Sequence, residues 1–341
     1  MPQLRRDPIT GRWVIVASER ARRPEDFSVS QDEMVDDGCP FCEGREDKTP
    51  PEIFAIRKAN TEPNKPGWDV RVVPSILPIL KIEGRLNRRG NGMYDLMNGI
   101  GAHEVIIETP QHILHLSDLP PEQIKKCIDT YIYRITDLEK DHRFKYALLF
   151  KNYGAIAGSR MYKHTRSQLI ATPVNPKLVK EELIGAKKYF DYKDRCIFCD
   201  MLKQELDSQD RIIIDMDGFI VMAPFASRFP FEAWILPKDH CCDFPRLPHA
   251  ARLDLARVLK ITLSKLKAAL NDPPYNFILH TAPFRIGKKT GYWKTIEDDF
   301  HWHLEIIPRV TRVAGFEWGS GVYINPTSPE EAARYLRDIE I

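Results

Sequence analysis

The strongest constraint in this sequence is a three-part pattern of cysteines and histidines that occurs twice in the same order. Each copy has a C-x-x-C pair, then a strand-like run ending in a proline and a histidine, then a histidine directly before another strand-like run. The segments are CPFC, HEVIIETPQH and HTRSQLIATP in the first half, and CIFC, FEAWILPKDH and HWHLEIIP in the second. The order is kept although the spacings differ, which indicates an internal duplication with one site per half.

Paired cysteines at this spacing favour a metal site, because two thiolates and two imidazoles complete the tetrahedron that structural zinc prefers. The candidate ligands are Cys39, Cys42, His112 and His164 in the first half, and Cys196, Cys199, His240 and His301 in the second. We therefore expect two structural Zn²⁺ sites. Two alternatives remain: a redox-active C-x-x-C pair, and histidines that are ordinary loop residues. The polar, proline-rich surroundings of CPFC favour metal over redox chemistry.

The spacing of apolar residues predicts an α+β chain. Strand-like runs cover 13–17, 103–108, 146–151, 167–172, 211–215, 219–224, 232–237, 276–281 and 302–307; helical patterns cover 121–141, 177–190, 249–270 and a segment from 328. Consecutive strands lack helical crossovers, which favours antiparallel sheets. A chain of 341 residues exceeds the usual single core, so we expect two domains, at 1–192 and 193–341.

The composition excludes several classes of protein. The formal net charge is +2, with 50 basic and 48 acidic residues, so no nucleic-acid partner is expected. No apolar run approaches the roughly 18 residues of a membrane-spanning helix, so no membrane partner is expected. The opening MPQLRRDPITGRWVIVASE lacks the apolar core of a secretory signal. These features predict a cytoplasmic globular protein.

Six longer segments carry a family resemblance. They are RDPITGRWVIVASERARRP, GAHEVIIETPQH, NYGAIAG, SQLIATPVNP, FHWHLEIIPR and GFEWGSGVYINPTSPEEAA. Over nearly its whole length the chain resembles the galactose-1-phosphate uridylyltransferase and ADP-glucose phosphorylase family, a duplicated form of the histidine-triad superfamily. The resemblance implies two tandem histidine-triad-like domains, each an antiparallel sheet with packed helices and a Cys2His2 zinc site. It also implies a homodimer that acts on a nucleotide sugar, such as UDP-glucose, and a sugar phosphate.

The resemblance further implies a nucleotidyl transfer in two steps. A histidine of the first half attacks the α-phosphorus, and a sugar phosphate then takes the nucleotidyl group from it. The residues implied to bind the nucleotide or its phosphates are Arg20, Arg23, Asn152, Ser159 and Gln168. The zinc is structural in this scheme, because it orients the loop that carries the reacting residues.

The chain departs from the family at the nucleophile. The family motif is His-Pro-His-x-Gln or His-Ser-His-x-Gln, whereas this sequence has His-Thr-Arg-Ser-Gln at 164–168. A guanidinium stays protonated and has no lone pair to attack phosphorus, so Arg166 cannot form the covalent intermediate. The preceding loop is one residue longer, which leaves Ser159 as the nearest phosphate-binding serine. In VVPSILP, Ser75 stands where the family usually has asparagine.

Several hypotheses follow for the reaction. In the first, a nucleotidyltransferase of the hexose-1-phosphate uridylyltransferase type works by direct displacement, and Arg166 clamps phosphate beside Gln168. In the second, the chemistry moves to His303, which holds the repeat-equivalent position of the nucleophile, while Glu305 replaces the glutamine. In the third, the protein binds a nucleotide as a sensor or regulator without turnover. A nucleotide-sugar phosphorylase or hydrolase is a further alternative.

Overall fold

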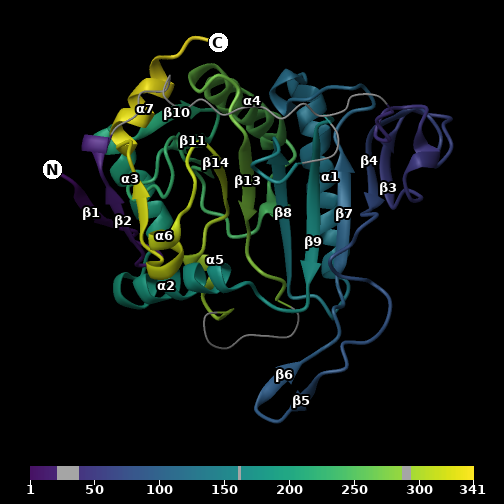
Figure 1. Ribbon diagram of the computed structural model, residues 1–341, viewed down its shortest axis with the longest axis horizontal. Coiled ribbons are helices and arrows are strands. Elements are labelled where there is room, and N and C mark those ends of the chain that lie inside the picture. The colour runs from purple at the N-terminus through teal and green to yellow at the C-terminus, as the bar shows by residue number, and fades with distance from the viewer. Residues whose placement is uncertain (21–37, 160–162, 286–292) are drawn as a thin grey trace.

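The central feature of the protein is one antiparallel sheet of ten strands (Figure 1). The computed structural model describes residues 1–20, 38–159, 163–285 and 293–341. The strand order is β10-β11-β12-β14-β13-β8-β9-β7-β4-β3. Its first-half strands are β3 (Phe54–Arg57), β4 (Trp68–Pro74), β7 (Ala102–Ile107), β8 (Tyr146–Tyr153) and β9 (Arg166–Thr172). Its second-half strands are β10 (Ile212–Met216), β11 (Phe219–Met222), β12 (Ala233–Pro237), β13 (Tyr275–His280) and β14 (His303–Pro308). The α+β class and the antiparallel pairing are therefore confirmed.

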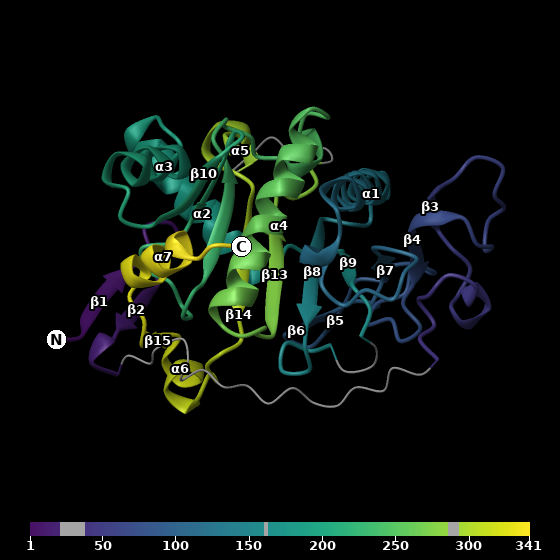
Figure 2. The same cartoon turned by 90° about the horizontal axis from the view of Figure 1, so that it is seen from above.

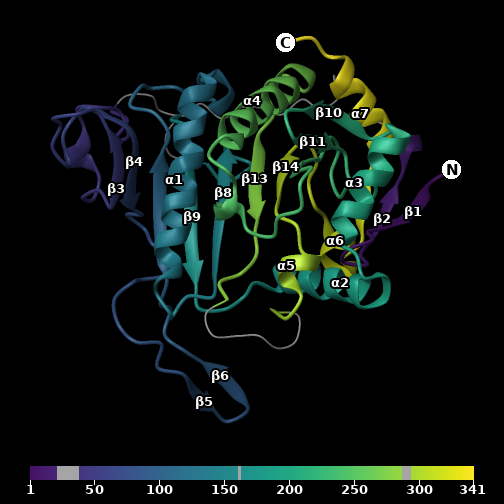
Figure 3. The same cartoon turned by 180° about the vertical axis from the view of Figure 1, so that it is seen from behind.

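The two halves repeat one arrangement and join at the middle of the sheet. In the first half, α1 (Pro121–Glu139) connects β7 to β8, and β9 pairs with both strands. In the second half, α4 (Ala251–Ala269) connects β12 to β13, and β14 pairs with both. β8 pairs with β13, so the sheet is continuous across the halves. α1 and α4 lie side by side across one face of the sheet (Figures 2 and 3), and their apolar residues form one buried core with it.

The N-terminal segment lies against the second half. β1 (Gln3–Arg6) and β2 (Trp13–Val16) form a small sheet with β15 (Tyr323–Asn325) near the C-terminus. The turn between β1 and β2 is held by Asp7, whose carboxylate accepts from the amides of Ile9 and Thr10 at 3.0 and 2.6 Å. A domain boundary at 192/193 stays a prediction. Residues 3–16 precede this boundary in the sequence but pack against β15 of the second half.

The remaining elements are mostly short. The helices are α2 (Lys177–Lys193), α3 (Ile197–Ser208), α5 (Ile296–Asp299), α6 (Gly315–Ser320) and α7 (Pro329–Asp338); the 3-10 turns are η1 (Ser18–Arg20), η3 (Glu46–Lys48), η4 (Leu116–Asp118) and η5 (Phe244–Arg246). β5 (Arg89–Asn91) and β6 (Tyr94–Leu96) form a hairpin that extends from the body (Figure 1). Among the described residues, no helix combines the length and the apolar character that crossing a membrane requires.

Candidate functional site

The structure brings the four predicted ligands of the first half together. The ligand atoms of Cys39, Cys42, His112 and His164 all lie within 4.8 Å of one another. Cys42 Sγ is 3.2 Å from His112 Nδ1, and Cys39 Sγ is 3.6 Å from His164 Nδ1. A tetrahedral ion with ordinary zinc bond lengths has sulfur–nitrogen edges of about 3.6 Å. The donor set and its spacing therefore fit a tetrahedral metal ion.

The tautomer of His164 supports the same conclusion. Its Nε2 lies 2.9 Å from the carbonyl oxygen of Thr109, which can only accept a hydrogen bond. Nε2 therefore carries the proton, and the lone pair of Nδ1 points at the thiolates. Metal-binding histidines are commonly oriented by such a bond.

The second half repeats this arrangement with Cys196, Cys199, His240 and His301. Cys199 Sγ is 3.3 Å from His240 Nδ1 and 3.7 Å from His301 Nδ1. The Nε2 atoms of the two histidines lie 2.9 and 3.0 Å from the carbonyl oxygens of Glu297 and Pro237. Both sets of four residues could hold a metal ion, and the repeat predicted from the sequence recurs in three dimensions.

Arg166 begins β9 and lies beside the first Cys2His2 group. Its guanidinium lies over the ring of Phe41, 5.2 Å from the centroid, and donates to Ser159 Oγ at 3.1 Å and to the carbonyl of His164 at 3.1 Å. Burial lowers the pKa of Arg166, and nearby Cys39 and Glu108 partly offset this effect. A guanidinium stays charged at neutral pH even so. Arg166 is therefore a fixed cation at the nucleophile position.

A buried ionic cluster lies on the opposite face of β9, the face that packs against α1. Lys151 Nζ donates to Glu108 Oε2 at 2.5 Å, to Thr165 Oγ1 at 2.8 Å and to the carbonyl of Arg166 at 3.0 Å. Glu108 also accepts from Thr165, from Ser167 at 2.5 Å, and from Tyr131 of α1 at 2.6 Å. These side chains are at most 3% exposed. Because Ser167 points to α1, Arg166 and Gln168 point to the other face of the sheet.

The charges of this cluster compensate each other. Burial alone raises the pKa of Glu108, but Lys151 and the hydroxyls of Ser167 and Thr165 hold it below the ordinary value. Burial lowers the pKa of Lys151, and Glu108 opposes that change. A buried charge is stable only when paired and hydrogen bonded, and both ions meet this condition.

Two amide side chains lie on the Arg166 face. Gln168 lies two residues after Arg166 on β9. In the strand register it faces Phe150 of β8 and Val105 of β7. Its Oε1 lies 2.9 Å from His103 Nε2, so the imidazole donates and the amide NH2 of Gln168 is directed elsewhere. Asn152 lies two residues beyond Phe150 on β8 and therefore projects to the same face. Figure 1 shows β7, β8 and β9 from this side.

The other residues predicted to bind phosphate are placed as follows. Ser159 is buried at the end of the NYGAIAG turn, where its amide donates to the carbonyl of Gly154 at 3.0 Å. Arg20 is the last residue of η1, and Arg23 lies outside the described residues. The structure thus brings Asn152, Ser159, Arg166 and Gln168 to one region of β8 and β9. Their roles in binding stay predictions.

Strand register identifies the matching positions of the second half. His280 faces His303 across β13 and β14, and Trp234 faces Glu305 across β12 and β14. His303 and Glu305 correspond to Arg166 and Gln168. In contrast with the first half, this face is closed: His303 is 0% exposed and its ring stacks on His280 and Trp234, with centroid distances of 4.6 and 4.9 Å. Burial, reinforced by neighbouring His280, lowers the pKa of His303 to about 4.

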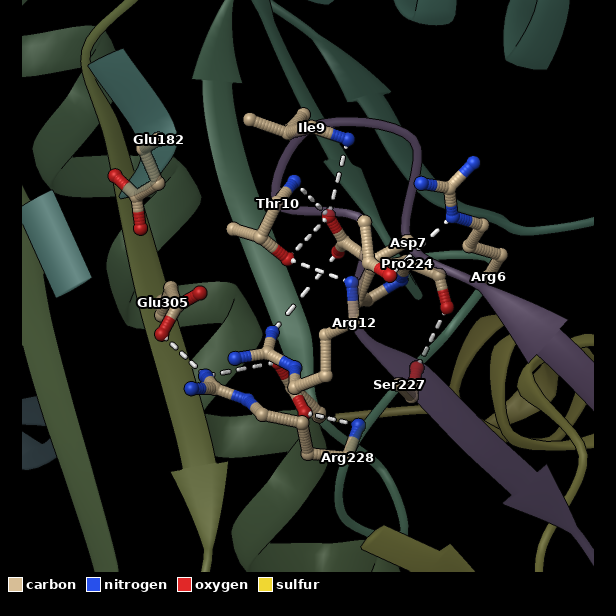
Figure 4. Close-up of polar contacts among 12 residues, drawn as sticks. Arg6, Asp7, Ile9, Thr10, Arg12, Glu182, Pro224, Ser227, Arg228 and Glu305 are labelled. Carbon is tan, nitrogen blue, oxygen red and sulfur yellow. Dashed lines mark hydrogen bonds and ion pairs between the residues drawn. The ribbon is translucent and has the colours of Figure 1, made fainter. Parts of the chain in front are cut away.

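Charged side chains fill the rest of the second-half position. Glu305 pairs with Arg228 at 2.5 Å, as Figure 4 shows, and lies 3.4 Å from His280 Nε2. Glu182 of α2 lies 3.0 Å from His280 Nδ1. Burial lowers the pKa of His280, but Glu182 and Glu305 raise it more, to about 10. Glu182, His280 and His303 could also hold a metal ion. His303 is therefore enclosed by this buried group and has no surface exposed to a ligand in the described conformation.

Sequence patterns did not single out several of these residues. Lys151, Glu108 and Glu182 lie in ordinary strand or helix patterns, and His103 and His280 have no counterpart in the repeated motif. Each acquires its partner from a distant segment, as with Lys151 and Glu108, which are 43 residues apart. A charged residue inside an otherwise apolar strand was the one available signal, and Lys151 in YALLFKNY shows it.

Comparison with known proteins agrees with this geometry. The model of the galactose-1-phosphate uridyl transferase N-terminal domain matches residues 1–176, and that of the C-terminal domain matches residues 182–332. The chain therefore belongs to the galactose-1-phosphate uridylyltransferase family. It is 37% identical to an ADP-glucose phosphorylase from Arabidopsis thaliana, over 100% of this chain and 93% of that protein. It is 28% identical to a galactose-1-phosphate uridylyltransferase from Thermotoga maritima, over 100% and 99% of the two chains.

Solved structures give the same result. The crystal structure of an ADP-glucose phosphorylase from Arabidopsis thaliana with bound ADP-glucose matches with a TM-score of 0.84 and 37% identity, covering 100% of both chains. A uridylyltransferase structure matches with a TM-score of 0.75 and 28% identity, covering 99% of this chain and 97% of that one. The family resemblance inferred from sequence motifs is confirmed.

Proposed function

We propose that this protein is a nucleotidyltransferase that acts on nucleotide sugars and hexose 1-phosphates by direct displacement. The observation that carries the proposal is the set of donors on one face of β8 and β9. Arg166 supplies a fixed cation held by Ser159, and Asn152 and Gln168 supply amides beside it. A cation with neutral donors is suited to the charge of a transferring phosphoryl group.

The reaction can proceed without a protein nucleophile. A phosphate oxygen of the acceptor attacks the α-phosphorus of the nucleotide sugar, and the bond from that phosphorus to the bridging oxygen breaks. The bridging oxygen leaves with the hexose 1-phosphate, and the acceptor phosphate carries the nucleotidyl group. Positioning and charge neutralisation supply most of the catalysis in phosphoryl transfer, and Arg166 can provide both. His303 is fully buried in the other half, which favours this route over a relocated nucleophile.

The two Cys2His2 groups are proposed to hold structural Zn²⁺. The first group contains His164, two residues before Arg166, so zinc there would fix the start of β9. We further propose two histidine-triad-like repeats at 1–192 and 193–341, which the repeated strand order and ligand sets support. A cytoplasmic homodimer remains part of the proposal, by likeness to the family.

Two substrate pairs test the function. The zinc-loaded protein is incubated with ADP-glucose and inorganic phosphate, or with UDP-glucose and galactose 1-phosphate, and the phosphorus NMR spectrum is followed. Glucose 1-phosphate that appears only when acceptor is present supports transfer. Release without acceptor indicates hydrolysis. Binding of the nucleotide sugar with no product from either pair would leave a binding protein and contradict the transferase.

A further inference from the structure

Asn276 of β13 contacts the amide of Asn152 from the second half of the chain. Its Nδ2 donates to Asn152 Oδ1 at 2.8 Å and to the carbonyl oxygen of Ala157 at 2.9 Å. The two asparagines face each other across the β8–β13 pair that joins the halves. We propose that Asn276 is a positioning residue that keeps the NH2 group of Asn152 turned toward bound phosphate.

The backbone carbonyl of Ala157 decides the orientation of both amides. A carbonyl oxygen can only accept, so the atom of Asn276 that faces Ala157 is the NH2 group. The same NH2 group faces Asn152, so the Asn152 atom that meets it is the oxygen, Oδ1. The NH2 group of Asn152 is therefore directed away from Asn276. Amide orientation is thus fixed through one backbone atom and two side chains.

The space beside Asn152 Nδ2 is consistent with a ligand approach. Gly158 has a φ of +100°, and a Cβ added there would lie 3.1 Å from Asn152 Nδ2. A side chain at this position would be strained and would crowd the amide. With glycine at 158, no Cβ crowds the NH2 group of Asn152. The carbonyl of the preceding residue, Ala157, fixes Asn276.

Gln168 shows the same arrangement through a different partner. His103 Nε2 donates to Gln168 Oε1 at 2.9 Å, and the amide of Ile79 donates to His103 Nδ1 at 3.3 Å. In both amides the oxygen is occupied by a protein donor, and among the described residues no hydrogen bond from the NH2 group to a protein acceptor is found. An anion needs donors, so two amides held in this sense are matched to phosphate. The inference rests on the proposed function, because it assigns Asn152 a bound phosphate.

The test compares four proteins by calorimetric titration with ADP-glucose and with UDP-glucose: the wild type, Asn276→Asp, Asn152→Ala and the double variant. A carboxylate at 276 has nearly the same shape but cannot donate to Ala157 or Asn152. It attracts the NH2 group of Asn152, whose oxygen then faces the ligand. We expect Asn276→Asp to weaken binding by about tenfold or more, as for a lost hydrogen bond to a charged group.

The double variant separates positioning from the effect of the added charge. If Asn276 acts through Asn152, Asn276→Asp causes no further weakening when residue 152 is already alanine. Equal weakening in both backgrounds would overturn the inference, as would wild-type affinity in Asn276→Asp. Asn276→Leu carries no charge and serves as the second variant, with a smaller loss that also disappears in the Asn152→Ala background. Circular dichroism and metal content confirm that each variant is folded.

The outcomes also distinguish this inference from the proposed function. If the wild type binds either nucleotide sugar and Asn152→Ala weakens binding while Asn276→Asp does not, the inference alone fails. If the wild type binds neither compound, the proposed function fails and the inference falls with it. Asn98→Asp, on an exposed segment away from β8, is the matched control and is expected to bind as the wild type does.

Discussion

Lys151 donates to the carbonyl oxygen of Arg166, so a buried ammonium holds the backbone of the residue at the nucleophile position. The same ammonium donates to the hydroxyl of Thr165, which stands where the family motif has proline or serine. The amide of Thr165 also donates to the carbonyl of Ile113 at 2.7 Å, a bond that proline could not make. The threonine and the arginine therefore belong to one local arrangement that fixes the start of β9.

Removing the ammonium should destabilise the protein strongly. In Lys151→Met, Glu108 remains buried without its partner, and we expect the free energy of unfolding to fall by about 3–5 kcal/mol. The double variant Lys151→Met/Glu108→Gln removes both charges and should lose less. Urea unfolding measures both effects. Lys126→Met is the control: its side chain is 39% exposed and its ammonium pairs with Asp69, so a loss below about 1 kcal/mol is expected. Equal losses at positions 151 and 126 would contradict the account.

The two Cys2His2 groups should lose their metal independently. We expect Cys42→Ser and Cys199→Ser each to lower the zinc content by about one equivalent per chain, because thiolates are the stronger ligands of such a site. Elemental analysis after gel filtration measures the content. Cys127→Ser is the control, since this buried cysteine belongs to neither group. An unchanged zinc content in either of the first two variants would show that its site holds no zinc.

Arg166 should contribute to nucleotide affinity as a cation. Arg166→Met removes the charge and keeps most of the length, and we expect the dissociation constant for the nucleotide sugar to rise about 10- to 100-fold. Ser159→Ala, which removes one contact of the guanidinium, should have a smaller effect. Calorimetric titration measures both. Arg257→Met on the exposed side of α4 should bind normally. Unchanged affinity in Arg166→Met would remove the arginine from the binding site.

Glu330 should make stability depend on acidic pH. It accepts from Arg5 at 2.8 Å and from Arg211 at 2.8 Å, and Arg211 also pairs with Glu205. Burial raises the pKa of Glu330, but the hydrogen bonds from the two arginines lower it by more. The net result is a pKa below the ordinary value of 4.5. The stabilisation that ionised Glu330 gives to the folded protein is therefore complete above pH 4.5. It is lost as the pH falls through the folded-state pKa of Glu330.

The pH effect is measured as the difference in melting temperature between the wild type and Glu330→Gln. The difference should be largest near neutral pH and should shrink as the pH falls through the folded-state pKa of Glu330, because the protonated carboxyl group is neutral, as glutamine is. Glu340→Gln, at an exposed position near the C-terminus, is the control. A difference that does not change with pH would show that the pairing with Arg5 and Arg211 is not electrostatic.

The packing of the N-terminal turn on α2 gives a further prediction. A Cβ at Gly185 would lie 1.8 Å from the carbonyl oxygen of Ile9, so the turn would have to move. We expect Gly185→Ala to destabilise by about 2 kcal/mol. In contrast, a Cβ at Gly319 of α6 would meet nothing within 4 Å. Gly319→Ala should therefore be neutral or stabilising, by up to about 1 kcal/mol. Urea unfolding compares the two, and a harmless Gly185→Ala would place the turn elsewhere.

Much of the fold follows from local patterns. Alternating apolar residues predicted the central strands, such as Tyr146–Tyr153, and a helical period predicted α1 and α4. α3 was missed, because its first turn contains the C-x-x-C pair and reads as a metal-binding loop. β4, Trp68–Pro74, was missed because a proline ends it and buried Arg71 interrupts its apolar run.

The metal ligands were predictable because two copies of one pattern gave independent support for each other. The orientation of the site was not, because it depends on contacts across the sheet. Asn276 and Asn152 are 124 residues apart, and although Asn152 opens the NYGAIAG segment, no motif marks Asn276 as its partner. The closed second-half position was also hidden, because His303 looks available in the sequence and only its stacking on His280 and Trp234 shows that it is not.

The most direct test of the central claim uses a nucleotide sugar labelled at the α-phosphate. The wild-type protein is incubated with labelled ADP-glucose or UDP-glucose and the matching acceptor, quenched in denaturant at alkaline pH, and assayed for protein-bound label and for glucose 1-phosphate. Direct displacement with Arg166 as the phosphate clamp predicts product with no label on the protein. Label on the protein, lost in His303→Ala and kept in Arg166→Ala, would show a covalent intermediate in the second half and contradict the account.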